Sequence, residues 1–246
     1  MLLTIDIGNS NIVVGKGETT VFETHRFQTD IHKSGDEYYH LMRHLFEDVN
    51  AVIIASVVPQ LNTLVKYFII KYFGIQPIFV GPGVKTGVKI LTDNPKEVGA
   101  DLVAGAAGVL SQYGQHAIII DMGTATTFTL LKDGEIKGVA ITIGLISSKD
   151  SLISRASKLL QFEFEIPKHV LGSNTIDSLN AGLVYGHTCQ ITGMVDKIKS
   201  TYRLDDIPVI ITGGASAMIA SLLPKTYQLD EHLILKGLQA IYKKQR

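Results

Sequence analysis

The fold of this chain is decided by two similar stretches, LTIDIGNSNIVV at residues 3–14 and IIIDMGTATTFTLL at residues 118–131. In each stretch an apolar run ends at Asp-x-Gly, small polar residues follow, and a second apolar run begins. This succession predicts a strand, a tight turn and a second strand. A third strand is expected at 21–27 in the first copy and at 136–141 in the second. We therefore predict an internal duplication with a lobe boundary near residues 114–116.

Alternating helices and strands are predicted around the two copies. Helices are expected at 35–49, 59–73, 97–113, 148–160, 175–202 and 231–244 and from 216 onward, and buried strands at 51–58, 77–80 and 208–212. Pro59 suits the first turn of a helix and Gly74 its end. The sequence thus predicts an α/β protein with two duplicated lobes, residues 1–115 and 116–246, each a mixed β-sheet with flanking helices.

Composition and charge exclude several classes of protein. Lys plus Arg and Asp plus Glu each total 23 of the 246 residues, so the formal net charge is zero. A dedicated nucleic-acid binder would be basic. The apolar runs are too short to cross a bilayer, and no signal peptide is expected. The single cysteine, Cys189, excludes an internal disulfide and is expected to pack inside a helix. We expect a cytoplasmic globular protein that binds neither nucleic acid nor membrane.

Both Asp-x-Gly turns carry the chemistry of a phosphate site. A glycine at the bend lets backbone N–H groups face an anion without an intervening Cβ. Asn9, Ser10 and Thr124 add hydrogen-bond donors. The carboxylates of Asp6 and Asp121 can each hold a cation that neutralises phosphates. Two such turns in a duplicated fold would hold one polyphosphate from two sides of a cleft, whereas the alternative is an ordinary duplicated hairpin.

Two further segments have a candidate role. Gly213 and Gly214 follow a buried strand and precede a helix, and the free N–H groups of a helix start can accept a nucleotide. Asp101 lies in the first turns of another predicted helix. It is either an acid favoured by the helix dipole or a general base that takes the proton of an attacking hydroxyl. The stretch GPGVKT at residues 81–86 is not a P-loop, because Val84 occupies the position of the second glycine.

Together these segments resemble a type III pantothenate kinase, the first enzyme of coenzyme A synthesis, over nearly the whole chain. The matching motifs are DIGNS at 6–10, SVVP at 56–59, VGPGVKTG at 80–87, NPKEVGAD at 94–101, IDMGTATT at 120–127, GSNT at 172–175 and TGG at 212–214. The resemblance implies an actin-like (ribonuclease H-like) fold in each lobe. It also implies transfer of a phosphate from ATP to pantothenate, which gives 4′-phosphopantothenate.

The resemblance assigns a role to particular residues. Asp101 would be the catalytic base, Asp6 would bind a divalent cation together with ATP, and Asp121 would bind a monovalent cation. The implied cofactors are ATP with Mg²⁺, and K⁺ or NH₄⁺. Contacts with ATP are implied for Asp6, Ile7, Gly8, Asn9, Ser10, Asn11, Ile12, Val13, Thr124, Gly213 and Gly214. Contacts with the small-molecule substrate are implied for Gly99, Ala100, Asp101, Leu102 and Thr175, the last across the interface of a homodimer.

The family pattern changes on the substrate side. Leu102 replaces an arginine that contacts the substrate, Thr92 replaces a tyrosine of the substrate pocket, and Ile143 replaces a proline in the loop 138–144. That loop also loses its second glycine, at Val139. These changes predict weak binding of pantothenate. Two alternatives stay open: the same machinery phosphorylates another small hydroxyl compound, or the chain is a non-catalytic regulatory or binding member of the family.

Overall fold

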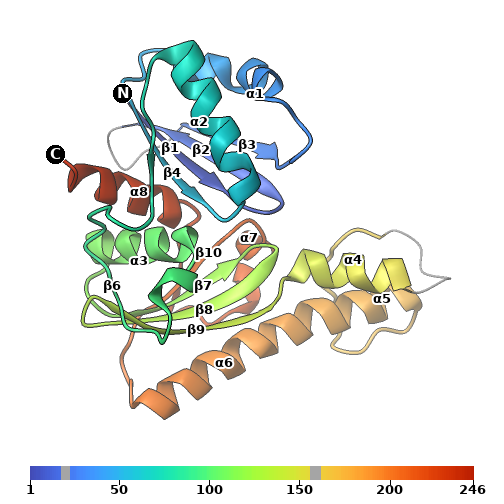
Figure 1. Cartoon of the computed structure of the whole chain (residues 1–246). Helices are drawn as coiled ribbons and strands as arrows, with labels where there is room; N and C mark the ends of the chain where they lie inside the picture. The colour runs from blue at the N-terminus through green and yellow to red at the C-terminus, as the bar shows by residue number, and fades with distance from the viewer. Residues whose placement is uncertain (18–22, 156–161) are drawn as a thin grey trace. The chain divides into compact units, whose positions relative to one another are not determined.

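The computed structural model describes residues 1–17, 23–155 and 162–246, and every structural statement below concerns these residues. The chain forms two compact units, coloured along the chain in Figure 1. Unit 1 comprises residues 1–115, 133–136 and 232–246, and unit 2 comprises residues 116–132 and 137–231. The units thus differ from the predicted lobes 1–115 and 116–246, because residues 133–136 and 232–246 belong to unit 1.

The sheet of unit 1 contains the first copy of the repeat. Its strands are β1 (Leu2–Ile7), β2 (Asn11–Lys16), β3 (Glu23–Gln28), β4 (Ala51–Ser56) and β5 (Ile78–Phe79). Their order across the sheet is β3-β2-β1-β4-β5. β2 is antiparallel to both β1 and β3, whereas β4 is parallel to both β1 and β5. β1 and β4 are nearly continuous apolar runs because both faces of these central strands are covered.

Helices lie on both faces of this sheet (Figure 1). They are α1 (Gly35–Met42), the 3₁₀ turn η1 (Arg43–Phe46), α2 (Pro59–Phe73), the 3₁₀ turn η2 (Pro95–Glu97), α3 (Ala100–Gln112) and α8 (Leu233–Lys243). A capping box of Ser34 and Glu37 begins α1. α2 begins at Pro59 and ends at Gly74, as predicted, and Gly74 has a φ of 65°. The predicted helix 35–49 is wrong after Met42, where the chain tightens into η1.

Close packing of α3 and α8 explains why the chain end belongs to unit 1. A Cβ on Gly237 of α8 would collide with the backbone of Ala104 and Gly108 in α3. A Cβ on Gly108 would likewise collide with the backbone of Leu233. Only glycine lets the two helix backbones approach this closely. The prediction of a lobe 116–246 did not include this contact, because α3 and α8 lie far apart in the sequence.

The second sheet repeats the topology of the first. Its strands are β7 (Ala117–Met122), β8 (Ala125–Lys132), β9 (Glu135–Ile143), β10 (Val209–Thr212) and β11 (Tyr227–Leu229), with the short β6 (Lys89–Ile90) at one end. The order is β11-β10-β7-β8-β9-β6, so β9-β8-β7-β10-β11 matches β3-β2-β1-β4-β5 of unit 1 strand for strand. β7 is antiparallel to β8 and parallel to β10. The predicted α/β duplication is confirmed.

The helices of unit 2 differ in detail from the prediction. They are α4 (Leu145–Arg155), α5 (Thr175–Asn180), the π-helical turn η3 (Ala181–Tyr185), α6 (Gly186–Tyr202), α7 (Ser216–Ile219) and the 3₁₀ turn η4 (Ala220–Leu222). α4 begins before the predicted 148, and the end of the predicted helix, 156–160, lies outside the described residues. The expected packing role of Cys189 is wrong, since this side chain is exposed on α6. In the described parts of the chain, no helix has both the length and the apolar character that a membrane span requires.

Candidate active site

The first Asp-x-Gly turn joins β1 to β2. Ile7 pairs with Ile12, and the Gly8 N–H donates to the Asn11 carbonyl at 3.0 Å, so residues 8–11 form the turn. The side chains of Ile7 and Ile12 are fully buried. Both residues are predicted to contact ATP, and only their backbone groups could reach a ligand. Asn9 and Ser10 are exposed at the tip, where they can offer hydrogen bonds to one.

Thr29, just after β3, fixes this turn. Its hydroxyl donates to the Gly8 carbonyl at 2.6 Å, and its backbone N–H donates to the Ser10 carbonyl at 3.0 Å. Two carbonyls of the turn are therefore directed toward the protein. That arrangement suits a turn whose outer side receives an anion, because carbonyl oxygens would repel it. Asp6, the residue before the buried Ile7, is part-exposed.

A cavity of about 750 Å³ lies in unit 1 beside the start of α3. It is lined by Ser56, Val57, Val80, Gly81, Pro82, Gly83, Val84, Thr86, Val88, Ile90, Pro95, Lys96, Glu97, Val98, Gly99, Ala100 and Val103. Three of the motifs that carry the resemblance, at 56–59, 80–87 and 94–101, therefore meet at one place. Of the predicted substrate contacts, Gly99 and Ala100 line this cavity, whereas Asp101 and Leu102 are not among its lining residues. Residues 80–84 also line the cavity, although the sequence motif that contains them predicts no role for them.

The carboxylate of Asp101 turns back against the start of its own helix. The backbone N–H of Leu102 donates to Asp101 Oδ1 at 2.7 Å, and a Cβ on Gly99 would collide with the same oxygen. Burial raises the pKa of the Asp101 carboxyl above its usual value, although the Leu102 N–H works in the opposite direction. A carboxylate with a raised pKa binds a proton more readily, which suits a general base. The hydrogen bond also fits the structural role of an acid at a helix start.

The second Asp-x-Gly turn, in unit 2, is held by hydrogen bonds from the segment that follows β9. The Gly123 N–H donates to the Ala125 carbonyl at 3.0 Å. The Thr124 carbonyl accepts from the Gly144 N–H at 3.0 Å and from the Ser147 hydroxyl at 2.8 Å. A side chain on Gly144 would collide with the backbone of the turn. Sequence reasoning missed Ser147 and the support given by Gly144, because both come from the segment after β9.

Gly213 packs directly against Asp121. It follows β10, in which Thr212 pairs with Asp121, and its φ of 94° is one that other residues rarely adopt. A Cβ here would collide with the Asp121 carboxylate. The hydroxyl of Ser216 donates to the Gly213 carbonyl at 2.6 Å. The structure therefore brings Asp121 and Gly213 together as predicted residues of one site, and Gly214 lies exposed beside them.

A buried histidine lies next to this turn. His187 on α6 forms a hydrogen bond of 3.0 Å between its Nε2 and the Oγ1 of Thr126, the residue that pairs with Met122. Burial lowers the pKa of His187, so the neutral imidazole is favoured. No sequence pattern points to His187, since a single histidine on a helix is unremarkable without its tertiary partner.

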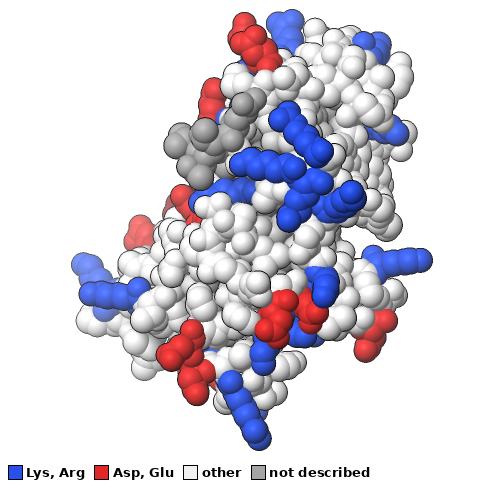
Figure 2. Space-filling model, turned by 90° about the vertical axis from the view of Figure 1, so that its left-hand side faces the viewer, with Lys and Arg blue, Asp and Glu red and all other residues white. Residues whose placement is uncertain are grey.

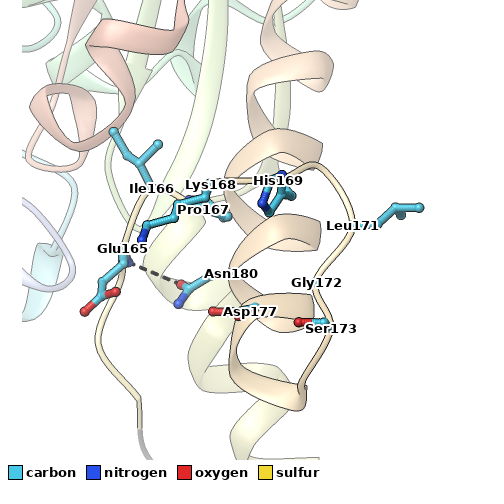
Figure 3. Close-up of a pocket in the computed structure, with 10 residues that line it drawn as sticks. All are labelled: Glu165, Ile166, Pro167, Lys168, His169, Leu171, Gly172, Ser173, Asp177 and Asn180. Atoms are coloured by element: carbon cyan, nitrogen blue, oxygen red, sulfur yellow. Dashed lines mark hydrogen bonds between the residues drawn. The ribbon is translucent and has the colours of Figure 1, made fainter.

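Thr175 is separate from both turns in the sequence and begins α5. Asn174 caps this helix by accepting the Asp177 N–H at 2.9 Å. The preceding segment encloses a cavity of about 320 Å³, lined by Glu165, Ile166, Pro167, Lys168, His169, Leu171, Gly172, Ser173, Asp177 and Asn180 (Figure 3). The exposed Leu171 points away from α5. Thr175 itself is exposed and does not line this cavity.

The three substituted family positions have different environments. Leu102 is half-buried, and Ile143 is 51% exposed. The hydroxyl oxygen of Thr92 is buried without a hydrogen-bond partner among the described residues. Within the same residues, no group of three or more His, Cys, Asp and Glu side chains could hold a metal.

Known proteins resemble this chain over its whole length. Residues 2–197 match the family model described as type III pantothenate kinase. A type III pantothenate kinase from Halalkalibacterium halodurans is 40% identical and covers 99% of this chain and 99% of its own. One from an Anaeromyxobacter species is 41% identical with full coverage of both chains. A solved structure of the activator of the 2-hydroxyisocaproyl-CoA dehydratase from Clostridium difficile, with bound ADPNP, has a TM-score of 0.54 at 14% identity and covers 98% of this chain and 93% of its own. This last likeness concerns the fold alone.

Proposed function

Because the chain belongs to the type III pantothenate kinase family, we propose an assignment of its reaction to individual residues. The chain is an ATP-dependent kinase that phosphorylates pantothenate to 4′-phosphopantothenate, the first step of coenzyme A synthesis. The observation that carries this conclusion is identity of about 40% with curated members of the family along the full length of both chains. The assignments that follow are proposals.

We assign the phosphates of ATP to the turn between β1 and β2. The exposed Asn9 and Ser10, at the tip of the turn, supply donors to phosphate oxygens. Asp6 helps to hold Mg²⁺, which neutralises charge on the phosphates when it is bound. Support comes from the way Thr29 occupies the carbonyls of Gly8 and Ser10.

The turn between β7 and β8 takes the monovalent cation and part of the nucleotide. Asp121 holds K⁺ or NH₄⁺, Thr124 contacts ATP, and Gly213 with Gly214 approaches the adenosine part. The proposal is supported by the contact of Gly213 with Asp121 and by the exposure of Gly214. A carboxylate fixed by a tightly packed backbone keeps its oxygens in place for a cation.

The acceptor occupies the cavity beside α3. Asp101 accepts the proton of the pantothenate hydroxyl while that oxygen forms a bond to the terminal phosphorus of ATP and the bond from this phosphorus to the ADP oxygen breaks. Electron count and charge then balance, with the proton on Asp101 and the leaving charge on ADP. The raised pKa of Asp101 supports this role. Gly99 and Ala100 line the cavity, and Leu102 follows the base without offering a hydrogen-bond donor.

We further propose a cytoplasmic homodimer in which Thr175 reaches the substrate bound by the partner subunit. Large apolar side chains are exposed in unit 2 at Ile141, Ile143, Ile146, Leu152, Ile166, Val170, Leu171 and Ile176. Exposed apolar side chains gathered in one part of a chain are typical of a protein interface. Thr175 lies next to one of them, Ile176.

Another small hydroxyl compound remains the second candidate for the acceptor, and the observation in its favour is Leu102 in place of arginine. The test is to incubate the protein with MgATP and equal concentrations of pantothenate and other small hydroxyl compounds, and to identify the phosphorylated product by mass spectrometry. The Asp101→Asn variant is the matched control. Phosphopantothenate as the main product supports the proposal. Phosphorylation of another compound in preference to pantothenate would assign the acceptor site to that compound.

A further inference from the structure

The loop of residues 80–88, VGPGVKTGV, forms one wall of the large cavity of unit 1. It joins β5 to β6, and seven of its residues line the cavity: Val80, Gly81, Pro82, Gly83, Val84, Thr86 and Val88. This loop contains the stretch that resembles a P-loop but lacks its second glycine. Because it supplies so much of the wall, its conformation decides the shape of the cavity.

The loop is attached at its first residue, where the Val80 N–H donates to the Ile54 carbonyl of β4 at 2.8 Å. Beyond Val80, local hydrogen bonds shape the loop but do not attach it to the rest of unit 1. The Val84 N–H donates to the Gly81 carbonyl at 3.1 Å. With Pro82 second and Gly83 third at a φ of 90°, this is a type II turn. The Val88 N–H donates to the Thr86 hydroxyl at 3.2 Å. Both bonds would move with the loop.

The side-chain amide of Gln245, after the end of α8, attaches the loop. Its Nε2 donates to the Lys85 carbonyl at 2.8 Å, and its Oε1 accepts the Lys85 N–H at 3.3 Å. The same Nε2 donates to the Ile241 carbonyl at 2.8 Å, which fixes the amide on the last turn of α8. Among the described residues, these two bonds to Lys85 are the only hydrogen bonds that join residues 81–88 to another part of the chain.

Neighbouring charges do not provide a substitute for this attachment. The stem of Lys244 lies over Gly87, where a Cβ would be 2.6 Å from the Lys244 Cε. Figure 2 shows Lys and Arg side chains gathered on the side of the molecule that carries α8. Lys85, Lys244 and Arg246 are exposed, and in the described part of the chain none of them forms a salt bridge. Among the described residues no ion pair therefore joins the loop to the end of α8, and the hydrogen bonds of Gln245 make this attachment.

We propose that Gln245 is a positioning residue for the acceptor site: its amide holds the loop 80–88 in the conformation that forms the cavity wall. This inference rests on the proposed function, because it places the acceptor in that cavity. The glycines at 81, 83 and 87 give the loop alternative backbone conformations when it is released. The acceptor then binds only the fraction of molecules with a formed wall, and its apparent affinity falls in proportion. Asp101 lies on α3 and keeps its place.

The first test is the kinetics of Gln245→Met. Methionine keeps the length and the apolar stem of glutamine but has no N–H donor and only a weakly accepting sulfur. We expect the KM for pantothenate to rise about 3- to 30-fold, as for the loss of one or two ordinary hydrogen bonds, with little change in the KM for ATP or in kcat. Gln112→Met is the matched control, since the Gln112 amide at the end of α3 bonds only the neighbouring Ser111 hydroxyl among the residues that the structure describes.

The second test does not depend on turnover. Amide hydrogen exchange of residues 81–88, measured without substrates, should be faster in Gln245→Met than in wild type or Gln112→Met, most of all at the Lys85 N–H. Unchanged exchange would overturn the attachment itself. Faster exchange with an unchanged KM for pantothenate would overturn the positioning role. Should wild type fail to phosphorylate pantothenate, the proposed function and the acceptor role fall together, and the exchange data still decide whether Gln245 holds the loop.

Discussion

The two Asp-x-Gly turns occupy the same place in the same strand order, yet the chain holds them differently. In unit 1, Ile7 pairs with Ile12 and residues 8–11 form the turn. In unit 2, Met122 pairs with Thr126 and residues 123–125 form a turn that is one residue shorter. Thr29, just after β3, holds two carbonyls of the longer turn, those of Gly8 and Ser10. The segment after β9 instead holds a single carbonyl of the shorter turn, that of Thr124.

The difference extends to the strand beside each turn. In unit 1, Ile7 pairs with Ser56 at the end of β4, and Ser56 lines the large cavity. In unit 2 the pairing of Asp121 with Thr212 puts Gly213 in the corresponding place, and Gly213 packs against the Asp121 carboxylate. A duplicated topology has therefore produced one open site and one closed one. Under the proposed function, the open unit receives the acceptor and the closed unit fixes the carboxylate of Asp121.

The largest expected effect tests whether proton transfer belongs to the open unit. Asp101→Asn should lower kcat about 10²- to 10⁴-fold, because asparagine keeps the shape but cannot accept the proton. Nucleotide binding, measured by calorimetry, should change little. A kcat within a few-fold of wild type, in a variant with an unchanged circular dichroism spectrum, would leave Asp101 only its role at the helix start.

The same variant carries a stability prediction whose sign follows from the raised pKa of Asp101. The unfolded carboxyl ionises at lower pH than the folded one, so the contribution of Asp101 to stability is full below the unfolded pKa and is lost as the pH rises through the folded pKa. Asp101→Asn should therefore raise Tm relative to wild type at neutral pH, and the advantage should shrink toward acid pH. A lower Tm of the variant at neutral pH would contradict the conclusion that burial of the ionised Asp101 carboxylate destabilises the folded protein.

The next effect tests the closed turn. Gly213→Ala should lower the free energy of unfolding by about 2–4 kcal/mol, because it adds backbone strain at positive φ to a collision with Asp121. Gly193→Ala, on α6 with open space around its Cβ, is the matched control and should be neutral or stabilising. Urea unfolding of both variants measures the difference. Equal free energies would mean that the second turn is not closed in the way described.

A smaller effect separates the two carboxylates. Replacing K⁺ with Na⁺ should lower the activity of wild type, and Asp121→Asn should lower it about 10- to 100-fold in K⁺ and remove the difference between the two ions. Asp6→Asn should instead raise the Mg²⁺ concentration required and keep the preference for K⁺. Titration of each ion against each variant measures both effects. If Asp6→Asn and Asp121→Asn changed the dependence on the same ion, the two turns would share one cation-binding role.

The smallest effect concerns the substituted substrate position. Leu102→Arg should lower the KM for pantothenate about fivefold, since a partly exposed charged contact is worth about 1 kcal/mol. The KM for ATP should stay as it is. An unchanged or higher KM for pantothenate would show that the acceptor site of this chain works without a positively charged side chain at position 102.

Local sequence patterns were sufficient for much of the fold. The repeated apolar runs and Asp-x-Gly turns predicted both meanders, and Pro59 and Gly74 predicted the ends of α2, because each of these features acts within a few residues. The 3₁₀ turn after Met42 and the π-helical turn at 181–185 were not predicted, since tertiary packing sets such local changes of winding. The return of α8 to unit 1 depends on the contact of Gly237 with Ala104, which no local pattern encodes.

The candidate site was predictable where its residues form a motif. Asp121 and Gly213 come from separate motifs, and the structure brings them together. The supports contributed by Thr29, Ser147 and His187 were missed, because each acts through long-range hydrogen bonds. Gln245 lies in a polar chain end without any motif, so only its contact with Lys85 reveals it.

The central claim is that this chain transfers phosphate from ATP to pantothenate, and the most direct test is ADP release by the wild-type protein in potassium buffer with MgATP, measured as a function of pantothenate concentration. The account predicts slow ADP release without pantothenate and a rate that rises to saturation as pantothenate is added. A rate that is the same at every pantothenate concentration would contradict it.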